Sequence, residues 1–128
     1  MEAYHWIAVA MLVLIMACSG CSSARPYTRS ERTALAHALV GQSLDVVTTD
    51  AALQSGQMRE ANPIWGDPDN AMPILIGKAA VLGLVWLYCE WRPQDRKSVW
   101  TILGVFGYGA AAWNTYQMID NDVNPWGE

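Results

Sequence analysis

The sequence predicts an all-α fold, a small membrane bundle of three to four helices. Long apolar runs separated by short polar segments cover residues 6–17, 34–53, 71–91 and 99–119, and the last two approach the ~20 residues that span a bilayer. The chain has seven Trp and five Tyr but one Phe, a choice typical of membrane–water boundaries. Single polar residues such as Lys78 and Asn114 interrupt the apolar runs, and in lipid such residues face a bundle interior.

Composition limits the classes of function. The chain has 128 residues, 52% hydrophobic and 16% charged, which suits one domain. A net charge of −4 argues against a nucleic-acid partner, which would select a basic face. Cys18 and Cys21 form a single C-x-x-C pair without the further ligands of a zinc site, so neither a metal nor another cofactor is expected.

The first apolar run has two interpretations, which the sequence leaves open. Residues 15–18, Ile-Met-Ala-Cys, resemble a bacterial lipobox, in which Cys18 would be acylated. The residues before the run include Glu2 and no Lys or Arg, unlike a signal peptide. Residues 1–23 are therefore either a signal peptide or lipobox-like segment, or a first membrane helix.

Loop charge predicts a topology. Arginine and lysine gather in residues 24–33 and 92–98, whereas the 56–70 connection and the C-terminal tail are mainly acidic. The positive-inside rule places the two basic segments in the cytoplasm. This predicts four spans in the inner membrane of a bacterial cell. A processed lipoprotein would instead be anchored in the envelope, with residues 18–32 outside and only the last two runs spanning.

Residues 24–128 are expected to form the helical domain, with helices at about 29–55, 70–91 and 98–119. Thr28 and Glu31 fit a capping box, and Gly56 can take the positive φ that ends the first of these helices. Asp69 or Asn70 can cap the second helix, and Asp95 or Ser98 the third. The third also carries a small-residue surface of the kind that allows close packing, comprising Gly104, Gly107, Gly109, Ala110, Ala111 and Ala112.

A polar stripe runs along the 34–53 run at spacings of three and four. Its members are His37, Gly41, Gln42, Asp45, Thr48 and Thr49. With Lys78 and Asn114 they converge in the outer half of the bundle, near Glu60 and Asn62 at its mouth. The candidate polar cluster is Asp45, Thr48, Thr49, Glu60, Asn62, Lys78 and Asn114.

The cluster has a structural interpretation as well as a functional one. Asp45 and Lys78 can form an ion pair, the two threonines can bond their own helix, and Asn114 can join helices. His37 is expected to be half exposed near the cytoplasmic end. Asp50 is expected to be solvated near the water boundary.

These residues carry a resemblance. Asp45-x3-Thr49, then Gly56-x3-Glu60-Ala61-Asn62-Pro63, then Lys78 and Asn114, resembles a family of small bacterial multi-span membrane proteins without an established activity. The similarity covers about residues 34–119. It implies a membrane fold and this choice of polar residues, and it supplies no mechanism.

Three hypotheses about function follow. In the first, a non-enzymatic membrane protein uses the cluster structurally, or to bind a small ligand or partner helix. In the second, an intramembrane enzyme or transporter subunit uses Asp45, Glu60 and Lys78; the absence of G-x-S-x-G, H-E-x-x-H and P-loop motifs argues against an enzyme. The third is a lipid-anchored lipoprotein. Expected partners are membrane lipid and a second copy or another membrane protein.

Overall fold

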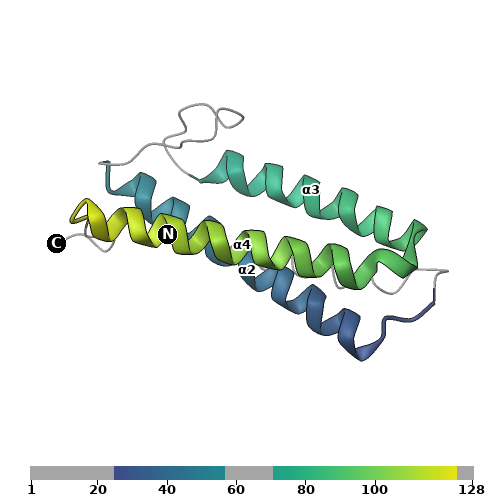
Figure 1. Cartoon of the computed structure of the whole chain (residues 1–128). Coiled ribbons are helices and arrows are strands. Elements are labelled where there is room, and N and C mark those ends of the chain that lie inside the picture. The colour runs from purple at the N-terminus through teal and green to yellow at the C-terminus, as the bar shows by residue number, and fades with distance from the viewer. Residues whose placement is uncertain (1–24, 57–70, 124–128) are drawn as a thin grey trace.

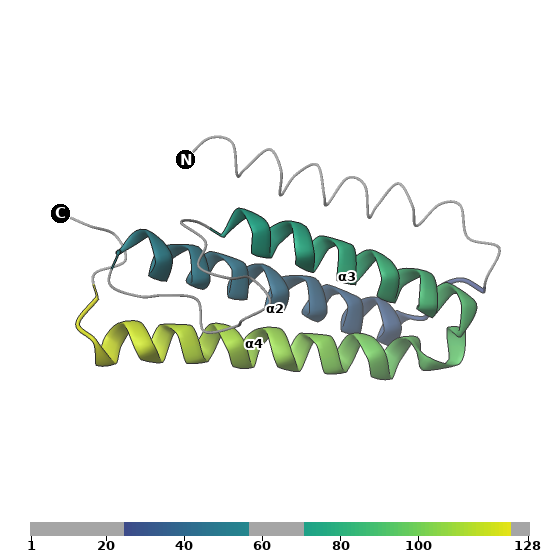
Figure 2. The same cartoon turned by 90° about the horizontal axis from the view of Figure 1, so that it is seen from above.

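The computed structural model describes residues 25–56 and 71–123, and this part of the chain is all-helical. The helices are α2 (Arg29–Gln54), α3 (Met72–Trp91), a short 3₁₀ helix η1 (Pro93–Asp95) and α4 (Arg96–Asp120). The three long helices lie side by side, with α2 and α4 running in the same direction and α3 antiparallel to both (Figures 1 and 2). The predictions about the first apolar run, Cys18, Glu60 and Asn62 lie outside the described residues.

The predicted ends of α2 are confirmed. The Glu31 N–H donates to the Thr28 hydroxyl at 3.3 Å, and the Thr28 N–H donates to the Glu31 carboxylate at 2.7 Å, which completes the capping box. At the other end, Gly56 has a φ of 68°, a conformation that glycine adopts without steric cost. Local sequence therefore decides where α2 starts and stops.

The beginnings of α3 and α4 differ from the expected caps. The N-cap of α3 is Ala71, and its N–H donates at 3.2 Å to the Asp50 carboxylate of α2. Asp50 is thus not simply solvated, because it joins two helices. Asp95 is the N-cap of α4, as expected, but its carboxylate accepts from the Tyr88 hydroxyl at 2.7 Å instead of capping the helix. Because η1 leads directly into it, α4 begins at Arg96, two residues before the expected start.

The α2–α4 contact is built on glycine. A Cβ added at Gly107 would collide with the backbone of Gly41 and lie 2.6 Å from the Gln42 nitrogen. A Cβ at Gly41 would lie 2.8 Å from the Gly104 carbonyl oxygen. The two backbones therefore approach as closely as only glycine allows. Gly41, expected in the polar stripe, is a packing position, and Gly109 faces open space.

The third helix packs through side chains instead of backbone. Leu82 and Cys89 of α3 are buried with Ala34 and Ala38 of α2 and Trp100 of α4. This apolar core lies toward the end of the bundle where η1 joins α3 to α4. Among the described helices, α3 alone is long and apolar enough to cross a membrane by length and composition, with a mean hydropathy of 1.8. The α4 segment is long enough but less apolar.

Candidate polar cluster between the helices

Asp45 is the centre of a hydrogen-bonded cluster that joins all three long helices. Its side chain comes from the middle of α2 and is buried, with 8% of the residue exposed. The Lys78 ammonium of α3 lies 2.5 Å from Asp45 Oδ2. The Asn114 amide of α4 donates to Asp45 Oδ1 at 3.1 Å. Both carboxylate oxygens therefore have partners, which is what a buried charge requires.

Two further residues of α2 complete the bonds of Lys78 and Asn114. The Lys78 ammonium also donates to Gln42 Oε1 at 3.0 Å, and Gln42 Nε2 donates to the Leu103 carbonyl oxygen of α4 at 2.8 Å. Asn114 Nδ2 lies 2.8 Å from the Thr49 hydroxyl, which in turn donates to Asp45 Oδ1 at 3.4 Å. These bonds link α2 to α3 on one side and to α4 on the other.

Thr48 has a smaller part in the cluster. Its hydroxyl donates to the Leu44 carbonyl oxygen of its own helix at 3.0 Å, as helical threonines commonly do. It also lies 3.2 Å from Asn114 Nδ2. An amide NH₂ has two hydrogens, so Asp45, Thr48 and Thr49 share them.

Of the seven predicted cluster residues, the structure brings five into contact: Asp45, Thr48, Thr49, Lys78 and Asn114. Glu60 and Asn62 lie outside the described residues. Gln42 was placed in the stripe but not in the candidate cluster, although its long amide reaches both neighbouring helices. The i, i+3 spacing of Gln42 and Asp45 is the sequence signal that could have included it.

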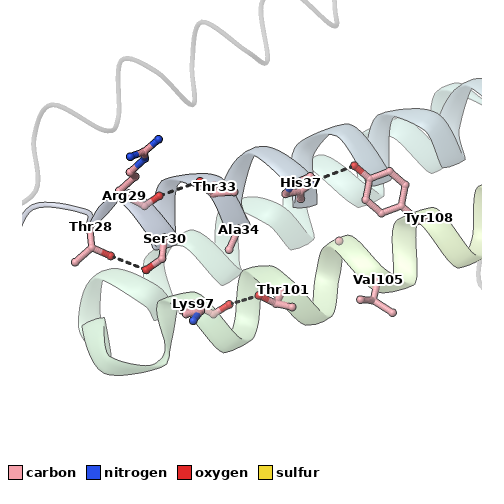
Figure 3. Close-up of a pocket in the computed structure, with 11 residues that line it drawn as sticks. Thr28, Arg29, Ser30, Thr33, Ala34, His37, Lys97, Thr101, Val105 and Tyr108 are labelled. Atoms are coloured by element: carbon pink, nitrogen blue, oxygen red, sulfur yellow. Dashed lines mark hydrogen bonds between the residues drawn. The ribbon is translucent and has the colours of Figure 1, made fainter.

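His37 lies away from this cluster. It is exposed, and its Nδ1 lies 3.2 Å from the Tyr108 hydroxyl of α4. Both residues line a groove between α2 and α4 at the end where these helices begin (Figure 3). The groove is about 870 Å³ in volume and is lined by residues of α2 and α4 without any of the cluster residues.

The charged groups of the cluster bond to one another and to side-chain amides of the same cluster. The carboxylate faces an ammonium and an amide, and the ammonium faces the carboxylate and a second amide. In the part of the chain that the structure describes, no group of three or more His, Cys, Asp or Glu side chains could hold a metal ion. The arrangement suits holding helices together more directly than it suits bond-making chemistry.

A second polar cluster, at the opposite end of the bundle from Gly56, was missed by the sequence analysis. Arg96 is fully buried and donates to the carbonyl oxygens of Cys89 at 3.1 Å and Arg25 at 2.7 Å. Its guanidinium also bonds the Glu90 carboxylate at 2.9 Å and lies 4.1 Å from the centre of the Tyr27 ring. Arg96 therefore joins the segment before α2 to the end of α3.

Glu31 belongs to the same end of the bundle. Arg25 lies 2.5 Å from its carboxylate, and this hydrogen bond, together with those from Thr28, lowers the pKa of Glu31 to about 2. Arg25 also donates to the Pro93 carbonyl oxygen at 3.1 Å. The capping box is thus tied to the connection between α3 and α4.

Comparison of this chain with models of protein families, with curated proteins and with solved structures finds no match.

Proposed function

We propose that this protein is a small, non-enzymatic integral membrane protein whose cluster around Asp45 holds α3 against the α2–α4 pair. The observation that supports this is the arrangement of side chains on α3, whose apolar residues are mostly exposed while its lysine faces the other helices. Its most apolar window has a mean hydropathy of 1.8, yet 17% of that window is buried inside the bundle. The Lys78 ammonium of the same helix turns inward to Asp45. In water the apolar side chains would be expected inside.

The other long helices have the same character. Large apolar side chains are exposed along all three: Val40, Leu44 and Val47 on α2, Ile76, Leu84, Leu87 and Trp91 on α3, and Ile102, Val105, Phe106, Trp113 and Ile119 on α4. A soluble monomer rarely exposes apolar patches of this extent. Lipid is the environment that accounts for such a surface around a polar interior.

The proposed role of the cluster follows from the forces available in a membrane. Lipid tails are as apolar as leucine, so burial of apolar surface does little to drive helices together. The α2–α4 pair has its glycine contact, but α3 packs through side chains. Hydrogen bonds and the ion pair of Lys78 are the interactions that can fix its register. The exposed apolar surface is then free to contact lipid, a second copy or a partner helix.

Two alternative functions make different demands on these residues. An enzyme or transporter using Asp45, Glu60 and Lys78 would need at least one of these groups available, and Asp45 and Lys78 engage each other. A lipid-anchored lipoprotein rests on the Ile15–Cys18 sequence, and incorporation of labelled palmitate that Cys18→Ser abolishes and Cys21→Ser preserves would test it.

Membrane extraction tests the proposal. We expect the full chain to stay with the membrane pellet in alkaline carbonate and in high salt, and to be released by detergent, because its apolar surface is embedded. Recovery of most of the protein in the carbonate supernatant would show a peripheral or soluble protein. A known peripheral membrane protein in the same preparation is the control for complete stripping.

A further inference from the structure

The groove between α2 and α4 lies on the side of this pair away from α3. It is lined by residues of the first turns of both helices and by no residue of α3 (Figure 3). Its floor contains the small buried residues Ala34 and Gly104, and the exposed Val105 lies at its edge. At the far end it meets the His37–Tyr108 contact, which bridges the two helices. At about 870 Å³ it is within the range of ligand pockets.

The groove is cationic at one end. Arg29 and Lys97 lie where α2 and α4 begin, both exposed, and neither forms an ion pair with another described residue. In Figure 3 the Arg29 side chain points away from Lys97, so it has to turn toward the groove to share a ligand with it. No Asp or Glu is among the residues that line the groove. The first-turn N–H groups of two parallel helices lie at this same end and add positive potential.

The hydroxyl groups along the walls are already occupied. Thr33 donates to the Arg29 carbonyl oxygen at 3.0 Å and Thr101 to the Lys97 carbonyl oxygen at 2.8 Å (Figure 3). Their hydroxyl hydrogens are therefore engaged by their own helices, and the basic side chains that can recognise a ligand are confined to the mouth. A ligand that fits this pattern has an anionic head and a hydrocarbon tail.

We propose that this groove binds an anionic phospholipid of the cytoplasmic leaflet, with its phosphate at Arg29 and Lys97 and an acyl chain along Ala34 and Val105. The inference rests on the proposed membrane location, in which the beginnings of α2 and α4 lie at the cytoplasmic surface. Anionic headgroups are found at this depth, and basic side chains there attract them. The groove is open and not an enclosed cavity, so a chain can enter it from the bilayer.

Native mass spectrometry of the full chain in detergent, titrated with defined lipids, tests this. We expect phosphatidylglycerol to be retained in preference to phosphatidylcholine. Arg29→Gln and Lys97→Gln should each weaken retention about fivefold, since one basic side chain near an anionic surface contributes on that order. Arg32→Gln is the matched control, because Arg32 is exposed on the same helix and does not line the groove. It should change retention little.

A second variant tests the edge of the groove. Val105 is 66% exposed, so Val105→Trp should leave the melting temperature unchanged while it fills the groove and lowers retention of phosphatidylglycerol. Equal retention of both lipids, equal losses from Arg29→Gln and Arg32→Gln, or no effect of Val105→Trp would overturn the proposal. Inorganic phosphate competing as well as the lipid would indicate a free-anion site. A lipid-free dimer lost in Val105→Trp would assign the groove to a second copy.

These outcomes are distinct from failure of the membrane proposal. Protein that resists carbonate extraction yet retains no anionic lipid contradicts the groove assignment alone. Protein that appears in the carbonate supernatant contradicts the membrane location itself.

Discussion

At the scale of single residues, the Asp45 carboxylate of α2 contacts both α3 and α4. It faces Lys78 at 2.5 Å and Asn114 at 3.1 Å, and it is mostly removed from solvent. A buried pair adds little net stability over an apolar replacement, but removal of one partner leaves an uncompensated charge. This asymmetry makes the pair testable.

Asp45→Asn or Lys78→Met alone should destabilise the protein by about 3–5 kcal/mol, because each leaves a single charge in a site of low dielectric constant. The double variant should recover much of this loss. Thermal unfolding in detergent of the wild type, both single variants and the double variant measures the coupling. Additive losses without rescue would mean that the two side chains do not interact energetically.

Glu31 predicts a dependence of stability on pH. Its pKa of about 2 is lowered from the ordinary value of 4.5, so Glu31 contributes stability that is fully present above pH 4.5 and is lost as the pH falls through 2. The difference in melting temperature between wild type and Glu31→Gln should therefore be largest near neutral pH and shrink between pH 4.5 and 2. A difference that stays constant over this range would show that Glu31 carries no such linkage.

The residues that sequence reasoning missed share a cause. A charged residue in a connection, such as Arg96, is ordinarily solvated, and its burial depends on carbonyl groups that only the assembled turn places around it. Its position at the start of α4, where the helix dipole disfavours a cation, gave no signal of this burial. Asp50 was missed because its partner is a backbone N–H of Ala71, which has no sequence signature.

At the scale of elements, local signals predicted the helices well. The capping box of Thr28 and Glu31 and the positive φ of Gly56 depend on neighbouring residues alone, and both appear in the structure. The convergence of Asp45, Lys78 and Asn114 followed from spacing and alternating helix direction. The contact partner of each glycine could not be predicted, because the contact between Gly41 and Gly107 depends on how α2 packs against α4.

The glycine contact predicts opposite outcomes at neighbouring positions. Gly107→Ala should destabilise the protein by about 1–3 kcal/mol, since its Cβ has no room against α2 and the helices must separate. Gly109→Ala is the matched control two residues away, with nothing within 4 Å of an added Cβ. It should be neutral or mildly stabilising. Equal melting temperatures for the two variants would contradict the close α2–α4 approach.

At the scale of the whole molecule, the described helices expose many large apolar side chains, and the ion pair of Asp45 and Lys78 lies between the helices. The two polar clusters connect the helices at different positions along the bundle. Arg96 fixes the end where α3 turns into α4, and the cluster around Asp45 fixes α3 farther along. We propose that lipid covers these exposed apolar side chains.

Cysteine accessibility tests this claim most directly. Leu84 is 67% exposed near the middle of α3, and Asp120 is exposed at the end of α4. In a background with Cys18, Cys21 and Cys89 replaced, Leu84→Cys should resist a water-soluble maleimide in membranes and react after denaturation in detergent. Asp120→Cys should react in both states once the membranes are permeabilised. Equal labelling of Leu84→Cys and Asp120→Cys in intact, permeabilised membranes would show that water, not lipid, surrounds α3 and would contradict the account.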